Sequence, residues 1–168
     1  LRRPVETRPR FCQGRGRTSR TIFALLTRAG APGPAAAQGD PELPYWASIS
    51  VDEARMRKGP SPDVPVVWEY RRKDLPVKVV ARHDIWRKIE DPDGTQGWMA
   101  ARLLSRTRTA IVTGGIRPMR EKPDAAAAIA FRAEAGVVGR ITDCKDGWCL
   151  FNVKGRKGWI ETDHIWGD

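Results

Sequence analysis

The chain has 168 residues, of which 40% are apolar and 30% are charged, and its mean hydropathy is −0.50. This composition is typical of a globular protein with one medium-sized or two small domains. The sequence contains no run of about 18 apolar residues, so we expect no transmembrane helix in the mature chain. The 16 Gly and 13 Pro residues favour short strands and many turns over long helices.

The net charge of +10 is concentrated near the N-terminus. Residues 1–28 hold eight Arg and a single acid, Glu6, whereas residues 29–168 hold 22 basic and 19 acidic residues. The positive charge therefore belongs mainly to the N-terminal segment. A strongly basic binding face on the rest of the chain is not supported by this count.

Residues 1–37 are predicted to be an export signal. An Arg-rich stretch is followed by the short apolar segment 21–27 and then by small residues at 35–37, which is the order typical of a secretory signal peptide. We expect cleavage between Ala37 and Gln38 and a periplasmic or secreted mature protein. The alternative is a disordered Arg-rich tail on a cytoplasmic protein.

From Tyr45 onward the sequence contains a tandem repeat. Five landmarks recur in the same order at offsets of 61 to 63 residues, namely Met56-Arg57 with Met119-Arg120, Pro62-Asp63 with Pro123-Asp124, Tyr70 with Phe131, Trp86 with Trp148, and Gly97-Trp98 with Gly158-Trp159. A collinear set of this kind is hard to obtain by chance. We therefore predict two tandem domains, at residues 45–106 and 107–168.

The local pattern of each copy is that of β-strands. Residues 77–80 are mostly β-branched, and residues 85–89 alternate in polarity before the turn sequence at 91–94. In the second copy, residues 149–153 run into a turn at 154–157. Residues 124–130 (DAAAAIA) favour helix by propensity, but their counterpart at 63–67 does not, so we expect extended or irregular chain there. The predicted fold class is all-β, with two tandem small β-barrels after a disordered or cleaved N-terminal segment.

These landmarks resemble a known family. The Met-Arg pair, the sequence GPSPD at 59–63, the Trp-led alternating strand and the Gly-Trp pair are similar to a bacterial SH3 domain (SH3b), and the tandem resembles exported SH3-like proteins of proteobacteria. The resemblance spans about Pro44 to Gly167, and the second copy departs from it at 120–123 (REKP). It implies recognition of a peptide, of peptidoglycan or of a partner envelope protein, with an extended ligand docked on an aromatic groove and no cofactor.

Cys144 and Cys149 flank a four-residue turn and are predicted to form a disulfide. Facing residues on adjacent antiparallel strands have Cα atoms about 4.5–5.5 Å apart, which suits a disulfide, and export would supply an oxidising compartment. Free core thiols and a metal site completed by His164 are the alternatives. Cys12 lies within the predicted signal.

Catalytic motifs are not found in the sequence. His83 and His164 each stand beside an Asp, but neighbours on a strand point to opposite faces, so we interpret both His residues as solvated turn charges. Asp91 and Asp93 are better explained by a hairpin turn than by a calcium loop. We expect no enzymatic activity, no cofactor and no bound metal.

The seven Trp residues divide into two groups. Those that recur are predicted to form the structural core and to be largely buried, namely Trp86, Trp98, Trp148 and Trp159. Aromatic residues that do not recur, with the basic residues beside them, are predicted to bind an anionic peptide or glycan, namely Tyr45, Trp46, Trp68, Tyr70, Arg71 and Arg72. The alternative is a structural aromatic cluster beside a solvated basic turn. Trp46 and Trp166 are also predicted to seal an interface between the two barrels.

The sequence as a whole predicts an exported, non-enzymatic binding module of the cell envelope. The alternative is a cytoplasmic nucleic-acid-associated protein that keeps its Arg-rich arm and binds through phosphate contacts that weaken with salt. Under the export hypothesis the arm is removed, and no nucleic-acid binding is expected.

Overall fold

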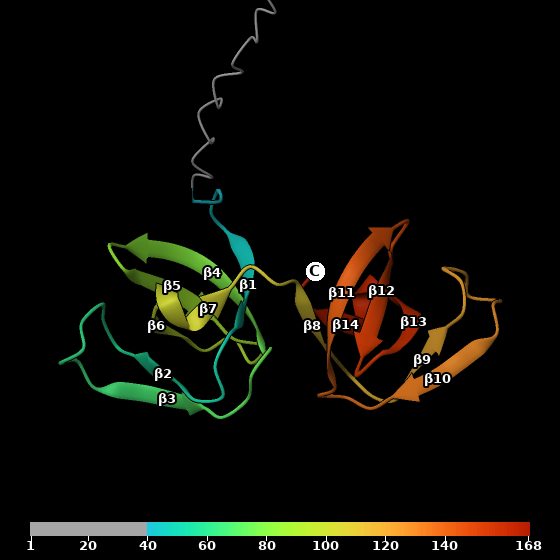
Figure 1. The fold of residues 1–168 in the computed structure, drawn as a ribbon, viewed down its shortest axis with the longest axis horizontal. Coiled ribbons are helices and arrows are strands. Elements are labelled where there is room, and N and C mark those ends of the chain that lie inside the picture. The colour runs from blue at the N-terminus through green and yellow to red at the C-terminus, as the bar shows by residue number, and fades with distance from the viewer. Residues whose placement is uncertain (1–39) are drawn as a thin grey trace, which may run out of the picture. The chain divides into compact units, whose positions relative to one another are not determined.

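The computed structural model describes residues 40–168, which form two antiparallel seven-stranded sheets (Figure 1). The predicted signal peptide, its cleavage point and Cys12 lie outside these residues. Only two short 3-10 helices interrupt the strands of the described part, so the predicted all-β fold class is confirmed. No helix among the described residues has the length and apolarity needed to cross a membrane.

The first sheet contains the strands that precede residue 106. They are β1 (Tyr45–Ile49), β2 (Ala54–Arg57), β3 (Val66–Tyr70), β4 (Pro76–His83), β5 (Trp86–Glu90), β6 (Gln96–Ala100) and β7 (Leu104–Ser105), with the 3-10 helix η1 (Ala101–Leu103) between the last two. Their order in the sheet is β3-β2-β6-β5-β4-β1-β7. No ladder joins β3 to β7 within the described residues, so the sheet is a partly open barrel.

The second sheet repeats this topology. Its strands are β8 (Thr109–Val112), β9 (Arg117–Arg120), β10 (Ile129–Ala133), β11 (Val138–Lys145), β12 (Trp148–Val153), β13 (Arg156–Glu161) and β14 (Ile165–Trp166), with η2 (Thr162–His164) before the last. The order β10-β9-β13-β12-β11-β8-β14 is that of the first sheet with each number raised by seven. The tandem repeat read from the landmark residues is therefore a repeat of structure.

The hairpin turns lie where the sequence places them. Lys154 and Gly155 both have positive φ, 51° and 90°, as a two-residue turn between twisted strands requires. Between β5 and β6 the Asp91 carboxylate accepts hydrogen bonds from the N–H groups of Asp93 and Thr95. The stretch 124–130 contains no helix, because the Asp124 carboxylate takes the N–H of Ala126 at 2.8 Å and closes a turn instead.

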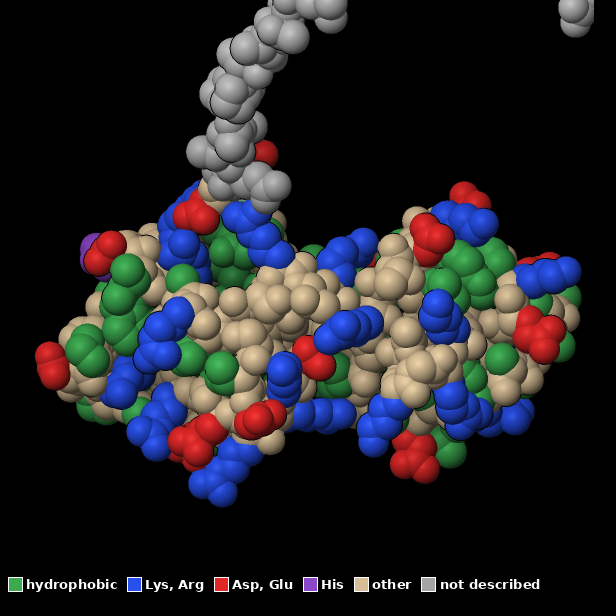
Figure 2. Space-filling view, in the orientation of Figure 1, with side chains coloured by type: hydrophobic (Ala, Val, Ile, Leu, Met, Phe, Trp, Pro, Cys, Tyr) green, Lys and Arg blue, Asp and Glu red, His purple; other side chains and the backbone are tan. Residues whose placement is uncertain are grey.

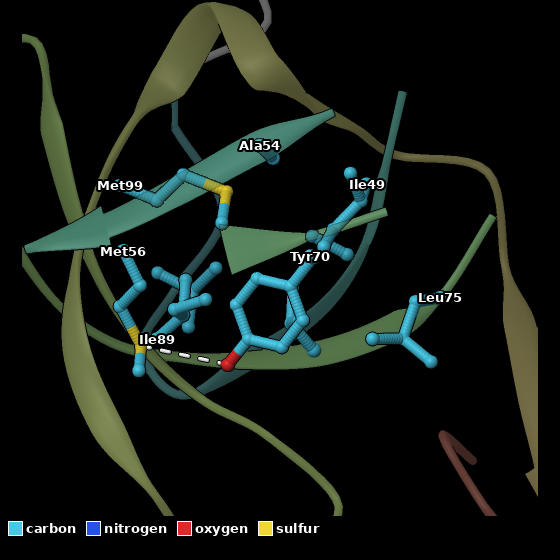
Figure 3. Close-up of a cluster of buried hydrophobic side chains, with 10 residues drawn as sticks. Ile49, Ala54, Met56, Tyr70, Leu75, Ile89 and Met99 are labelled. Atoms are coloured by element: carbon cyan, nitrogen blue, oxygen red, sulfur yellow. Dashed lines mark hydrogen bonds between the residues drawn. The ribbon is translucent and has the colours of Figure 1, made fainter. Parts of the chain in front are cut away.

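Each barrel has its own apolar core. The first includes Ile49, Met56, Tyr70, Leu75, Ile89 and Met99 (Figure 3), and the second includes Met119, Phe151 and Ile160. The Tyr70 hydroxyl donates a hydrogen bond to the buried Asp91 carboxylate at 2.9 Å and lies 3.6 Å from the Met56 sulfur. Burial and this carboxylate raise the pKa of Tyr70 well above its ordinary range.

The four recurring Trp residues are not the core, and this corrects the sequence prediction. Trp86, Trp98, Trp148 and Trp159 are half-buried, and none belongs to either core cluster. Strand alternation is the reason: in β6, Gly97 and Met99 are buried and Trp98 between them faces outward. Trp159 is placed in the same way in β13, with the ammonium of Lys145 5.3 Å from its ring centre.

A close approach between β2 and β6 explains why glycine precedes tryptophan in both copies. A Cβ atom built on Gly97 would lie 2.5 Å from Met56 Cγ and 2.9 Å from the carbonyl oxygen of Arg57. In the second barrel, a Cβ atom built on Gly158 would lie 2.6 Å from the Cβ atom of Met119. Each Gly-Trp pair therefore marks the point where the second strand of a barrel crosses the sixth.

The predicted disulfide is present. Cys144 and Cys149 face each other across β11 and β12, with Cα atoms 4.1 Å apart. Their sulfurs are bonded to each other, so the structure supports neither the free-thiol nor the metal-ligand alternative. In the chain-entropy model, closing so short a loop stabilises the fold by about 2 kcal/mol.

Trp46 and Trp166 pack against each other as predicted. Their ring centres lie 4.6 Å apart, with the planes at 83°. Ile111 and Val138 of the second barrel also pack against the core of the first, and the two barrels belong to one compact unit. The contact between the barrels is thus apolar and aromatic.

Gly97→Ala is expected to lower the free energy of unfolding by about 1–3 kcal/mol, because the added methyl group has no room beneath Met56. Urea unfolding of the full chain measures this change. Gly59→Ala is the control, since a Cβ there would lie an ordinary 3.5 Å from Val64, and it should change the value by less than about 0.5 kcal/mol. Equal effects of the two substitutions would contradict the close approach.

Trp46→Ala and Trp166→Ala are each expected to lower the melting temperature of both barrels together, because the indole pair joins them. An aromatic pair of this kind contributes about 0.5–1.5 kcal/mol beyond the area it buries. Calorimetry of the full chain checks this, with Trp68→Ala as control because that side chain is 58% exposed. Two independent transitions in the unsubstituted chain would rule out a sealed interface.

Candidate functional site

The candidate site is a groove on the first barrel, which we call the Trp86 groove. It has a volume of about 370 Å³ and is lined by Glu53, Arg55, Arg57, Pro62, Trp86, Ala100, Arg102 and Leu103. These residues come from the position just before β2, the β2–β3 hairpin, the start of β5, the end of β6 and η1. The site therefore lies where segments distant in sequence meet.

Two walls of the groove are fixed by backbone pairing. Trp86 begins β5 and lies opposite Ala100, which ends β6. The next residue, Ala101, donates its N–H to the carbonyl of Ile85 at 2.8 Å, which holds η1 beside Trp86. The indole and the helical turn that carries Arg102 are therefore adjacent because of the sheet register.

The third wall is the loop of the β2–β3 hairpin, and an arginine fixes it. The Arg57 guanidinium donates to the carbonyl of Val64 at 2.7 Å, across the loop at 58–65 that carries Pro62. Arg120 makes the same bond to Ala127 in the second barrel, at 2.6 Å. The recurring Met-Arg pair thus combines a core side chain with a brace for the loop.

The charge of the groove is positive, with three Arg side chains and one Glu along its lining. Arg55 forms ion pairs with Glu69 at 3.0 Å and with Glu53 at 3.1 Å, and the hydrogen bond to Glu69 raises the pKa of Arg55. Hydrogen bonds from Arg71 and Arg55 in turn hold the pKa of the Glu69 carboxyl below its ordinary value. Arg102 is exposed and forms no ion pair within residues 40–168.

The groove therefore offers an indole surface beside guanidinium groups. Guanidinium groups bind carboxylates and phosphates through paired N–H donors, and an indole face accepts apolar or sugar surfaces by stacking. This combination suits an extended ligand that carries at least one negative charge.

The end of this face differs in charge between the two barrels, whereas Arg57 and its counterpart Arg120 keep the same charge. Where the first barrel has Ala100 at the end of β6 and Arg102 and Leu103 after it, the second has Glu161, Asp163 and His164. His164 Nδ1 lies 3.2 Å from the Glu161 carboxylate. The two barrels share a fold but not the chemistry of this face.

The structure does not bring the six predicted ligand-binding residues together. Tyr45 is half-buried against the first core, and Trp46 is packed on Trp166. Tyr70 is a core residue with only 6% of its surface exposed, and its hydroxyl is bonded to Asp91.

Trp68 is the exposed aromatic residue of the predicted set, on the edge strand β3. Arg71 is paired with Glu69 at 2.9 Å, and Arg72 lies in a different cleft, between the barrels. None of the six lines the Trp86 groove.

The residues that do line the groove have a recognisable sequence pattern, which the prediction of buried Trp residues did not use. Trp86 starts a strand at a turn, and Arg55 and Arg57 alternate with the buried Met56. A residue that alternates with a buried neighbour faces outward, so the outward arginines could have been read from that pattern.

No curated protein matches the chain. Two similar solved structures are those of NlpC1 and NlpC2 from Trichomonas vaginalis, at 15% and 16% identity and TM-scores of 0.35 and 0.36. The matches cover 79% and 77% of this chain but 49% and 50% of those proteins, so this chain spans about half their length.

The family model for the bacterial SH3 domain matches the chain at residues 50–106 and again at residues 114–167. Each match lies on one seven-stranded sheet and includes its Met-Arg and Gly-Trp landmarks. The protein therefore belongs to the bacterial SH3 domain family and carries two such domains in tandem.

Proposed function

We propose that this protein is an exported, non-enzymatic binding module of the cell envelope. Its first barrel binds an extended anionic ligand in the Trp86 groove. The ligand is a carboxylate-bearing peptide, either the stem peptide of peptidoglycan or a segment of an envelope protein.

The observation that carries the proposal is the grouping of Trp86 with Arg55 and Arg102 around a groove of about 370 Å³. Arg102 is the cation best suited to contact a ligand, because Arg55 is paired with two carboxylates and Arg57 braces the hairpin loop. Stacking on the indole would orient a ligand, and the guanidinium would select one with negative charge.

The export part of the proposal has its own support. A disulfide such as Cys144–Cys149 persists in an oxidising compartment and is uncommon in the reducing cytosol. The basic, apolar and small-residue order of residues 1–37 is typical of a secretory signal. Both features favour a location outside the cytoplasm.

Arg102→Gln is expected to weaken binding to purified peptidoglycan by about fivefold, because the substitution removes a charge that no residue of the described chain neutralises. Co-sedimentation of the full chain with insoluble peptidoglycan measures this change. Arg106→Gln is the control, since Arg106 is also exposed, lies four residues away outside the groove, and has only a long ion pair with Asp40 at 3.9 Å.

Three outcomes are informative. Weakening in Arg102→Gln alone supports the groove. Equal binding by both variants contradicts the groove as the ligand site, and no binding by the unsubstituted chain removes peptidoglycan and leaves a protein segment as ligand.

N-terminal sequencing of the protein isolated from bacterial cells is expected to give a start near Gln38, with the protein in the periplasmic or secreted fraction. Removal of residues 1–37 would take away most of the positive charge. An intact Arg-rich N-terminus in the cytoplasmic fraction would contradict export and favour the nucleic-acid alternative.

A further inference from the structure

A second cleft lies between the two barrels and shares no residue with the Trp86 groove. It has a volume of about 410 Å³. One wall is the turn after β3, with Arg72 and Lys73, and the other is formed by Arg140 of β11, Asn152 of β12 and the turn at Lys154 and Gly155. Neither barrel forms this inter-barrel cleft alone.

The lining of the inter-barrel cleft has an excess of positive charge. Arg72, Lys73, Arg140 and Lys154 face a single carboxylate, that of Asp74. Within residues 40–168 none of these four cations forms an ion pair, whereas Arg55, Arg71 and Arg87 each do. Four like charges with a single counter-charge repel one another, and a bound anion would relieve that repulsion.

Neutral donors add to the charge. Arg140 pairs with Asn152 across β11 and β12, so the two side chains lie on the same face of the sheet. The Asn152 Oδ1 atom accepts the N–H of Gly155 at 2.9 Å, which leaves the amide NH2 group of Asn152 free to donate. Gly155, which is exposed, also lines the cleft.

We propose that the inter-barrel cleft binds a compact oxyanion with two or more negative charges, such as an oligophosphate or a tricarboxylate. No aromatic residue lines the cleft, so recognition would rest on charge and hydrogen bonds and not on stacking. The volume lies within the range of about 300–1,000 Å³ that is usual for small-ligand sites. Because both barrels supply cations, the ligand would bridge them.

Titration calorimetry of the full chain with inorganic tripolyphosphate tests the proposal, and a parallel titration with citrate separates phosphate from carboxylate preference. Arg72→Gln removes a charge from the first barrel, and Arg140→Gln removes one from the second. Each is expected to weaken binding by about fivefold, and a rise in salt should weaken it further. Both side chains are exposed, so the melting temperature should stay unchanged.

The controls separate this site from general surface charge and from the Trp86 groove. Arg71 is the neighbour of Arg72 in the chain, but it is paired with Glu69 and does not line the cleft. Arg71→Gln should therefore leave binding unchanged. Arg102→Gln should also leave it unchanged. The proposal is overturned by absence of saturable binding, by an effect of Arg71→Gln as large as that of Arg72→Gln, or by sensitivity to only one barrel's arginine.

Discussion

The contact of Met56 with Gly97 is the constraint on which each barrel depends. β2 lies against β6 in the sheet, and a Cβ at residue 97 would stand 2.5 Å from the Met56 side chain. The same contact recurs between Met119 and Gly158. It buries the methionine, brings the β2–β3 hairpin across the sheet and turns the following Trp outward. Arg57 and Pro62 of that hairpin line the Trp86 groove, so this contact helps to place one of its walls.

The two barrels keep this contact and differ in the 3-10 helix that follows the sixth strand. Arg102 of the first barrel corresponds to Asp163 of the second, and Leu103 corresponds to His164. Buried positions are held by packing, because a core tolerates little change of volume, whereas outward positions are free to change charge. Figure 2 shows basic and acidic side chains interspersed over one face of the molecule, which agrees with the small net charge of residues 29–168.

The fold could be predicted from the sequence because its signals are local. Turn residues such as Lys154-Gly155 and Asp93-Gly94 fix the hairpins, and the spacing of the landmarks fixes the repeat. The site could be predicted only in part. The glycine of each Gly-Trp pair recurs because the contact with Met56 or Met119 requires it, whereas the recurring Trp residues are only half-buried. The burial of Tyr70 depends on Asp91, 21 residues away, and the inter-barrel cleft joins segments more than 60 residues apart. Contacts at such separations leave no local pattern.

The hydrogen bond from Arg57 to the carbonyl of Val64 has a thermodynamic consequence for the hairpin loop. A loop that is ordered only in a complex must surrender backbone freedom worth about 1–2 kcal/mol per residue, and that loss subtracts from affinity. Here the guanidinium already ties the two ends of the loop together in the unliganded protein. The backbone entropy of the loop is therefore lost during folding and not on binding. A short ligand with few contacts can then still bind.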